Sequence, residues 1–69
     1  MLTIGEAMKK ARLEKGFSRS RLSLKSGIAV QNINKWERGE TFPTIINLIP
    51  IADVLGVTLD ELVGRTVEK

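Results

Sequence analysis

Apolar residues recur along the chain at intervals of three and four, the spacing of amphipathic α-helices, and no segment alternates with period two as a strand would. Capping residues and glycines mark the ends of these segments. Thr3 with Glu6 forms a capping-box pattern, Ser18 is a good N-cap, and Thr58 with Glu61 repeats the first pattern. The pattern therefore predicts five short helices, over residues 4–15, 19–26 and 30–38, in a segment ending before Gly56, and over residues 59–63.

The start of the fourth helix is open on sequence alone, because two residues could cap it. Thr44 and Asn47 both suit an N-cap, and Pro50 follows both. A helix beginning at Thr44 would lose the hydrogen bond to the carbonyl of Ile46 and kink at Pro50, at a cost of about 3 kcal/mol. A helix capped by Asn47 would hold Pro50 in its first turn, where no donor is needed. We expect one kinked or broken helix rather than two well-formed ones.

Five short helices in 69 residues predict a single compact all-α domain over residues 1–64, followed by a flexible C-terminal tail over residues 65–69. Burial of one large apolar side chain contributes about 1.5–3 kcal/mol, so about a dozen of them suffice for a marginally stable domain. Helical phase predicts a core formed by Ile4, Met8, Phe17, Leu22, Ile28, Ile33, Trp36, Leu48, Ile49, Ala52, Leu55, Val57, Leu59 and Leu62.

The third predicted helix has two chemically opposite faces at about 100° per residue. One face can be packed inward and consists of Ala29, Val30, Ile33, Trp36 and Glu37. The other carries amides and cations, namely Gln31, Asn34, Lys35 and Arg38. Such side chains can reach base edges and phosphates in a major groove. A short helix of this kind, held at an angle by the helix before it, is the layout of a helix-turn-helix DNA reader.

Composition narrows the function classes. The chain has no cysteine and no histidine, which excludes a disulfide framework, a thiolate metal site and the usual proton shuttle at neutral pH. No apolar run approaches the roughly 20 residues that span a membrane, and no signal-peptide pattern opens the chain. We therefore expect a cytoplasmic protein without membrane contact. We expect no catalytic residues, no cofactor and no metal.

Charge is distributed unevenly between the two halves of the chain. Residues 1–38 hold nine cations against three anions, or +6, and residues 39–69 hold two cations against five anions, or −3. The basic half contains the helix-turn-helix block, as a polyanion-binding face would require. The alternative is a solvated, lysine-rich surface that happens to lie near one terminus.

Several residues match a known family in identity and spacing. They are Arg12-x-x-x-Gly16-Phe17-Ser18, Leu22-Ser23, Gly27-Ile28, Ile33-x-x-Trp36-Glu37-Arg38-Gly39, Pro43, and Ala52-x-x-Leu55-Gly56-Val57-x-x-x-x-Leu62. On these motifs the stretch from about Ile4 to Leu62 resembles the Cro and cI-type helix-turn-helix repressors, the XRE family. The resemblance implies a lambda-repressor-like domain of five helices that binds operator DNA as a dimer, with the third helix in the major groove.

The resemblance also implies roles for individual residues. Base edges would be read by Val30, Gln31, Asn34 and Lys35. Phosphates would be contacted by Ser18, Arg19, Asn32 and Arg38. Arg12 and Glu37 would form a structural ion pair that fixes the angle of the reading helix. The alternative for each polar residue is a solvated surface side chain.

Four departures from the family pattern bear on this interpretation. Arg19 stands where glutamine is usual, Ser23 replaces a small alanine between the second and third helices, and Ala29 replaces a serine cap. Glu40 and Phe42 occupy loop positions that are commonly basic. These last two changes predict fewer phosphate contacts from the loop, and hence modest affinity or another task for it.

The function expected from the sequence is that of a sequence-specific transcriptional regulator. We expect a repressor that binds double-stranded operator DNA as a homodimer, with a dimer contact formed by the apolar residues Val57, Leu59 and Val63. The alternative is a protein-binding helix-turn-helix module, such as an antitoxin whose main partner is a toxin. The salt dependence of DNA binding would separate the two.

Overall fold

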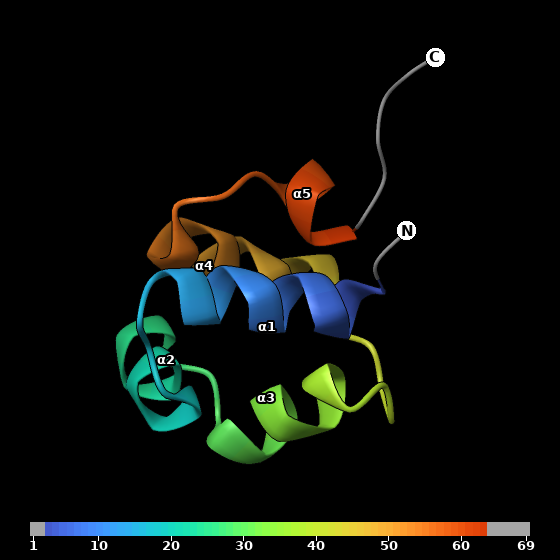
Figure 1. Cartoon of the computed structure of the whole chain (residues 1–69). Coiled ribbons are helices and arrows are strands. Elements are labelled where there is room, and N and C mark those ends of the chain that lie inside the picture. The colour runs from blue at the N-terminus through green and yellow to red at the C-terminus, as the bar shows by residue number, and fades with distance from the viewer. Residues whose placement is uncertain (1–2, 64–69) are drawn as a thin grey trace.

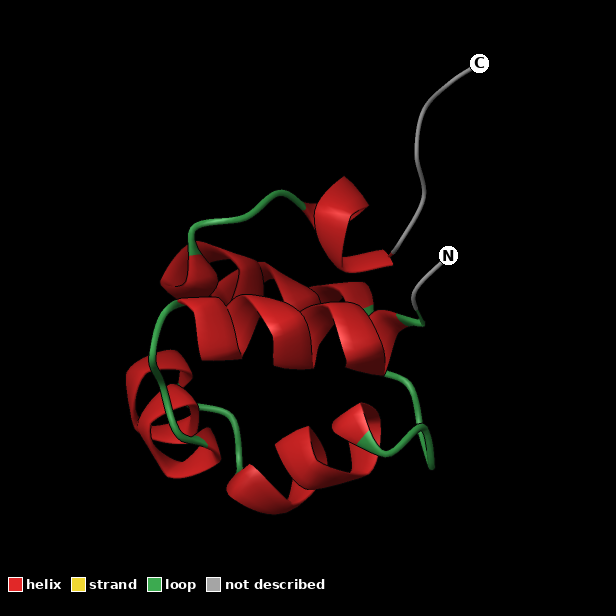
Figure 2. Cartoon of the chain, viewed as in Figure 1, coloured by secondary structure: helices red, strands yellow, loops and turns green. Residues whose placement is uncertain are grey.

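The computed structural model describes residues 3–63, and this part of the chain is built of helices joined by short loops. In chain order they are α1 (Ile4–Glu14), α2 (Arg19–Ser26), α3 (Val30–Glu37), α4 (Ile45–Leu55) and α5 (Leu59–Val63) (Figure 1, Figure 2). The prediction of five helices in an all-α fold is confirmed. The tail predicted at residues 65–69 and the domain end placed at residue 64 lie outside the described residues.

The predicted caps form as expected. Thr3 Oγ1 accepts from the Glu6 amide at 3.1 Å while the Glu6 carboxylate accepts from the Thr3 amide at 3.0 Å, which completes the capping box of α1. Thr58 and Glu61 make the same pair of bonds before α5. α1 and α3 each end one residue earlier than predicted, within the usual uncertainty of a helix end.

α4 is a single helix that begins directly after Thr44 and contains Pro50 in its interior. Thr44 Oγ1 accepts from the Asn47 amide at 3.3 Å, so Thr44 rather than Asn47 is the N-cap. Pro50 removes one donor from the helix at a cost of about 3 kcal/mol. The helix forms nonetheless because it buries Leu48, Ile51 and Leu55, each worth about 1.5–3 kcal/mol.

The helices surround α1, which runs through the middle of the molecule. α2 and α3 lie on one side of α1 and α5 on the other, while α4 lies behind α1 in the view of Figure 1. α1 contacts both α3 and α5, α2 contacts α3 and α4, and α4 contacts α5. α3 is therefore held by two other helices, one of which is the central one.

The core differs from the predicted one mainly at α4. Ile49 was expected inside and is exposed, whereas Ile51 is fully buried. The inward face of a helix that starts at Ile45 passes through Leu48, Ile51, Ala52 and Leu55, and Ile49 lies on the flank beside this face. Five other predicted core residues are only half-buried and pack around the edge of the core, namely Ile4, Phe17, Ile28, Val57 and Leu59. Ala7 and Ala11, which were not predicted, are buried.

Candidate nucleic-acid interface

α3 separates its residues into a buried and an exposed side. Ile33 and Trp36 are buried in the core, and Gln31, Asn32 and Lys35 are exposed. Val30 and Asn34 are half-buried at the border between the two sides. The amide- and ammonium-bearing face of the helix therefore points to solvent. All four predicted base-reading residues lie on α3, and two of them, Gln31 and Lys35, are exposed. Asn32, which was predicted to contact phosphate, is exposed on the same helix.

The expectation that Ala29 packs inward is wrong. Ala29 is the N-cap residue of α3, with an extended backbone (φ −60°, ψ 138°), and its side chain is exposed. Because it lies outside the helix, the helical phase used to place it does not apply. No side chain caps this end of α3.

The turn between α2 and α3 is fixed by local hydrogen bonds. Gly27 ends α2 in the left-handed conformation (φ 78°), which only glycine adopts without strain. The Ser23 hydroxyl donates to the carbonyl of Ile28, and the Ser26 hydroxyl accepts from the Ile28 amide at 3.3 Å. Ser23, which departs from the family pattern, thus binds the turn to α2.

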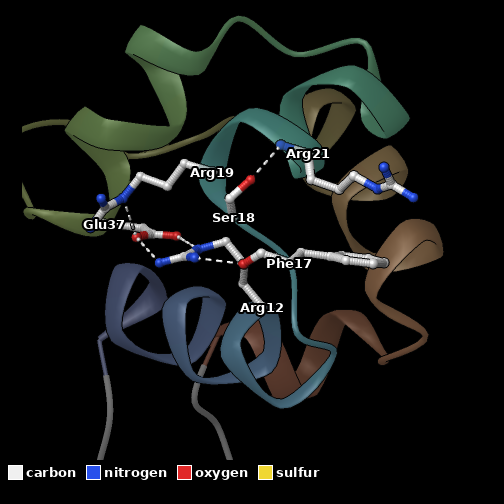
Figure 3. A network of polar contacts seen from close by, with 6 residues as sticks. All are labelled: Arg12, Phe17, Ser18, Arg19, Arg21 and Glu37. Carbon is white, nitrogen blue, oxygen red and sulfur yellow. Dashed lines mark hydrogen bonds and ion pairs between the residues drawn. The ribbon is translucent and has the colours of Figure 1, made fainter.

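A buried ionic network joins α1, α2 and α3 (Figure 3). Arg12 Nε donates to Glu37 Oε2 at 2.8 Å and Arg12 Nη2 donates to Glu37 Oε1 at 3.2 Å, a two-point contact between guanidinium and carboxylate. Arg12 Nη1 donates to the carbonyl of Phe17 at 2.8 Å. Arg19 Nε donates to Glu37 Oε1 at 2.9 Å. The Arg12 and Glu37 side chains are 6% and 1% exposed, and that of Arg19 is 42% exposed.

The network has consequences for charge and for geometry. Two guanidinium groups share one carboxylate, so the cluster carries a net charge of +1, and its partly exposed member is Arg19. Glu37 is the last residue of α3, so the bonds tie this end of the helix to α1 and to the start of α2. Sequence reasoning paired Arg12 with Glu37 but assigned Arg19 only to phosphate. The bond from Arg19 to Glu37 was not predicted. The sequence feature that could have indicated it is the long cationic side chain of Arg19, at a position where the family has glutamine.

Gly5 provides a second attachment of α3 to α1 that sequence reasoning did not find. It is buried in the first turn of α1, and a Cβ atom at this position would overlap the carbonyl oxygen of Trp36 and touch Glu37 Cα. α1 and α3 therefore approach backbone to backbone. Glycine inside a helix costs about 1 kcal/mol relative to alanine, and that cost was the available sign of a close contact.

Comparison with known proteins agrees with this geometry. A family model described as helix-turn-helix matches residues 8–62. The chain belongs to this family, in its XRE branch. It is 37% identical over 65 residues to y4dJ of Sinorhizobium fredii, an uncharacterized HTH-type transcriptional regulator, covering 94% of this chain and 84% of y4dJ.

Two further relatives are better described. The transcriptional repressor RstR of the cryptic phage CTXphi in Vibrio cholerae is 49% identical over 39 residues, which is 56% of this chain. The matched part is 35% of RstR, so the likeness covers about a third of that repressor's length. The crystal structure of SinR, the master regulator for biofilm formation, in complex with DNA matches with a TM-score of 0.84 and 38% identity, over 87% of this chain and 97% of that one. SinR is a protein of Bacillus subtilis.

In this helix-turn-helix domain, the remaining predicted phosphate residues lie at the helix ends. Ser18 is the N-cap of α2, and its hydroxyl oxygen accepts from the Arg21 amide at 3.0 Å (Figure 3). Arg38 follows α3, and its Nε lies 2.9 Å from a carboxylate oxygen of Glu40, with both side chains largely exposed. A phosphate that approached Arg38 would have to compete with Glu40 for the guanidinium.

The three apolar residues predicted to form a dimer contact are only partly available to a partner. Val57, Leu59 and Val63 are half-buried and pack against the core. Among residues 3–63, no group of acidic residues is placed to hold a metal ion. Within the same range, every helix is too short or too polar to cross a bilayer.

Proposed function

We propose that the chain binds duplex DNA sequence-specifically through α3, as a homodimer on a two-fold operator, and that it represses transcription. The observation that carries the proposal is the exposed face of α3, with Gln31 and Lys35 pointing to solvent from a helix whose other side is buried in the core. The relatives support the same function, since RstR is a transcriptional repressor and SinR has been solved with DNA.

Each residue on this face offers a different base contact. The Gln31 amide can donate to and accept from the edge of an adenine, and the Lys35 ammonium suits the O6 and N7 acceptors of guanine. Val30 can contact a thymine methyl with the exposed part of its side chain, and Asn34 can reach a base edge beside it. In the free protein the side chains of Gln31 and Lys35 are already exposed, so they can contact DNA without any rearrangement of the core.

Phosphate contacts would position α3 without reading sequence. Arg19 uses Nε on Glu37, and its Nη1 and Nη2 groups remain for a phosphate oxygen. Because Glu37 is itself held by Arg12, this guanidinium is oriented before DNA binds. Ser18, Asn32 and Arg38 are the other phosphate candidates. All four lie on α2, on α3 or at their ends.

Selection of bound fragments from a random duplex library tests the proposal directly. We expect a two-fold-related site with half-sites about 34 Å apart, which is one turn of DNA. Gln31→Ala and Lys35→Ala should each relax base choice at one position of the half-site, and Arg19→Ala should weaken binding evenly across sequences. Lys15→Ala is the matched control for charge, because Lys15 lies beside Gly56 at the end of α4. Equal losses on all sequences for all three variants would contradict these roles.

Salt dependence separates DNA reading from the protein-binding alternative. With roughly six phosphate contacts, affinity should fall about a thousandfold between 50 and 200 mM salt. Arg19→Ala should reduce the slope by about one contact, whereas Arg19→Lys should retain the slope but lose the orientation given by Glu37. A protein partner such as a toxin would bind with far weaker salt dependence. Repression itself would be measured by transcription in vitro from a promoter that carries the selected site.

A further inference from the structure

An apolar stripe runs along the outside of α4 and has no partner within the described chain. It consists of Phe42, Ile45, Ile46 and Ile49, which are 70%, 56%, 79% and 46% exposed. At about 100° per residue, Ile45, Ile49 and Ile46 follow one another around one flank of α4, beside its buried face. Phe42 lies in the loop that precedes the helix. Scattered exposed apolar residues are common on soluble proteins, but here three exposed isoleucines are neighbours on one helix, and an exposed phenylalanine lies just before it. Exposed apolar groups of this kind mark contact sites.

The surroundings of the stripe indicate the chemistry of its partner. Residues 41–52 contain no charged side chain, and this is the longest uncharged stretch in the sequence. Glu40 and Asp53 border it, and the half of the chain before it is strongly basic. A partner that covers the stripe therefore needs an apolar, uncharged surface. An identical stripe on a second copy meets that requirement, with no like charges at the centre of the contact.

We infer that the apolar stripe is the contact between two copies of this chain, related by a two-fold axis that passes close to Ile46. This inference rests on the proposed binding to a two-fold operator. The stripe begins five residues after the end of α3, and the connecting loop runs along one edge of the molecule from α3 to α4 (Figure 1). Phe42 lies five residues after Glu37, so a contact that includes Phe42 keeps the axis within about 18 Å of the end of each α3. A two-fold contact at this distance allows both α3 helices to face one duplex.

The available area predicts a weak contact that DNA completes. With full side-chain areas of about 200 Å² each, the four residues expose about 500 Å² per copy, or about 1,000 Å² for the pair. That lies at the lower limit for specific interfaces, where dimers dissociate readily. The half-buried residues Val57, Leu59 and Val63 offer a smaller apolar surface, since much of each is already covered by the core. The free protein is thus expected to be largely monomeric and to pair on the operator.

Cysteine cross-linking tests the position of the axis, because the natural chain contains no cysteine. Ile46→Cys places one thiol on each copy beside the proposed axis, where a disulfide requires Cα atoms about 4.4–6.8 Å apart. Leu24→Cys is the matched control, since Leu24 on α2 is 80% exposed and Ile46 is 79% exposed. With protein alone at rising concentration, Ile46→Cys should cross-link at least tenfold faster than Leu24→Cys. Equal rates for the two variants would overturn the inference.

A charge substitution separates this inference from the proposed function. Ile46→Asp sets two carboxylates against each other across the axis. The affinity of this variant for the selected two-fold site should therefore fall at least tenfold. Its affinity for a duplex that carries one half-site should change less than twofold. Leu24→Asp should change neither. If Ile46→Asp binds the two-fold site as cooperatively as the wild type and Val63→Asp binds it without cooperativity, the dimer contact lies on α5. That result would overturn the inference. Wild-type protein that binds no duplex, but whose Ile46→Cys variant cross-links selectively, would refute the proposed function and leave this contact standing.

Discussion

Replacing Glu37 by methionine is expected to be one of the most damaging single changes in this domain. The carboxylate is 1% exposed and accepts three hydrogen bonds from two arginines. In Glu37→Met, Arg19 can turn toward water, but Arg12 is 6% exposed and keeps only its bond to the Phe17 carbonyl. Stranding one partner of a buried ion pair typically costs about 3–5 kcal/mol. Total stability of a small domain is about 5–15 kcal/mol, so a large part of it should be lost.

The converse change should cost less, because the network is asymmetric. In Arg12→Met the Glu37 carboxylate keeps Arg19 Nε at 2.9 Å, so the buried charge is not left alone. In the double variant Arg12→Met/Glu37→Met neither charge is buried, and two methionines can fill the space of the salt bridge. We therefore expect Glu37→Met to be the least stable of the three. The double variant should be at least about 2 kcal/mol more stable than the sum of the single changes predicts.

Urea unfolding followed by tryptophan fluorescence measures these differences. Trp36 is the only tryptophan in the chain, is buried, and directly precedes Glu37, so its emission reports on the end of α3. Glu14→Met is the matched control, because the Glu14 carboxylate is exposed and lies 4.0 Å from Lys10. It should change stability by less than about 0.5 kcal/mol. A loss below about 1 kcal/mol in Glu37→Met, or additive single changes, would refute the argument that the network fixes α3.

Three further changes test other parts of the interface. Glu40→Gln frees Arg38 from an exposed ion pair worth up to about 1 kcal/mol and removes an anion beside the proposed DNA path, so affinity for the selected duplex should rise about two- to fivefold at low salt. A reduced affinity in a filter-binding or anisotropy titration would contradict this. Gly5→Ala should destabilise the domain by more than about 2 kcal/mol in thermal unfolding, because the added methyl overlaps the backbone of Trp36. An unchanged Tm would mean that α1 and α3 separate without cost. Ala29→Ser should raise the free energy of unfolding by about 1 kcal/mol in urea, since α3 lacks a side-chain cap. No increase would show that the backbone at Ala29 does not allow the cap to form.

Local sequence signals determined most of the secondary structure. The capping pairs Thr3–Glu6 and Thr58–Glu61 satisfy donors three residues away, so the structure has the same bonds that the spacing predicts. The two faces of α3 follow equally from helical phase, because Ile33 and Trp36 lie three residues apart on the same side of the helix. Signals of this kind depend on neighbours within one or two turns.

The features that sequence reasoning missed depend on contacts between elements. A proline inside a helix is unfavourable, so the sequence alone allowed α4 to begin after Thr44 or after Asn47. The packing of Leu48, Ile51 and Leu55 against the other helices decides between these two starts. Placing Ile49 inside was an error of the same origin, since the inward face depends on how α4 lies against α2 and α5. The bond from Arg19 to Glu37 spans 18 residues and requires the relative position of α2 and α3.

The two ends of α3 are supported differently, and this bears on how the helix would meet DNA. Its C-terminal end is fixed by Glu37 and by the close approach of Gly5, whereas its N-terminal end has no side-chain cap. The Asn32 and Ile33 amides donate to the Ala29 carbonyl, and the Val30 and Gln31 amides belong to the first turn, where the helix itself provides no acceptor. A phosphate oxygen at this end would supply the missing acceptor and meet the positive end of the helix dipole. A serine at position 29 would take one of these donors in the free protein. The stability gained by Ala29→Ser is therefore expected to come with equal or lower DNA affinity, because the cap and the phosphate would compete for the same amides.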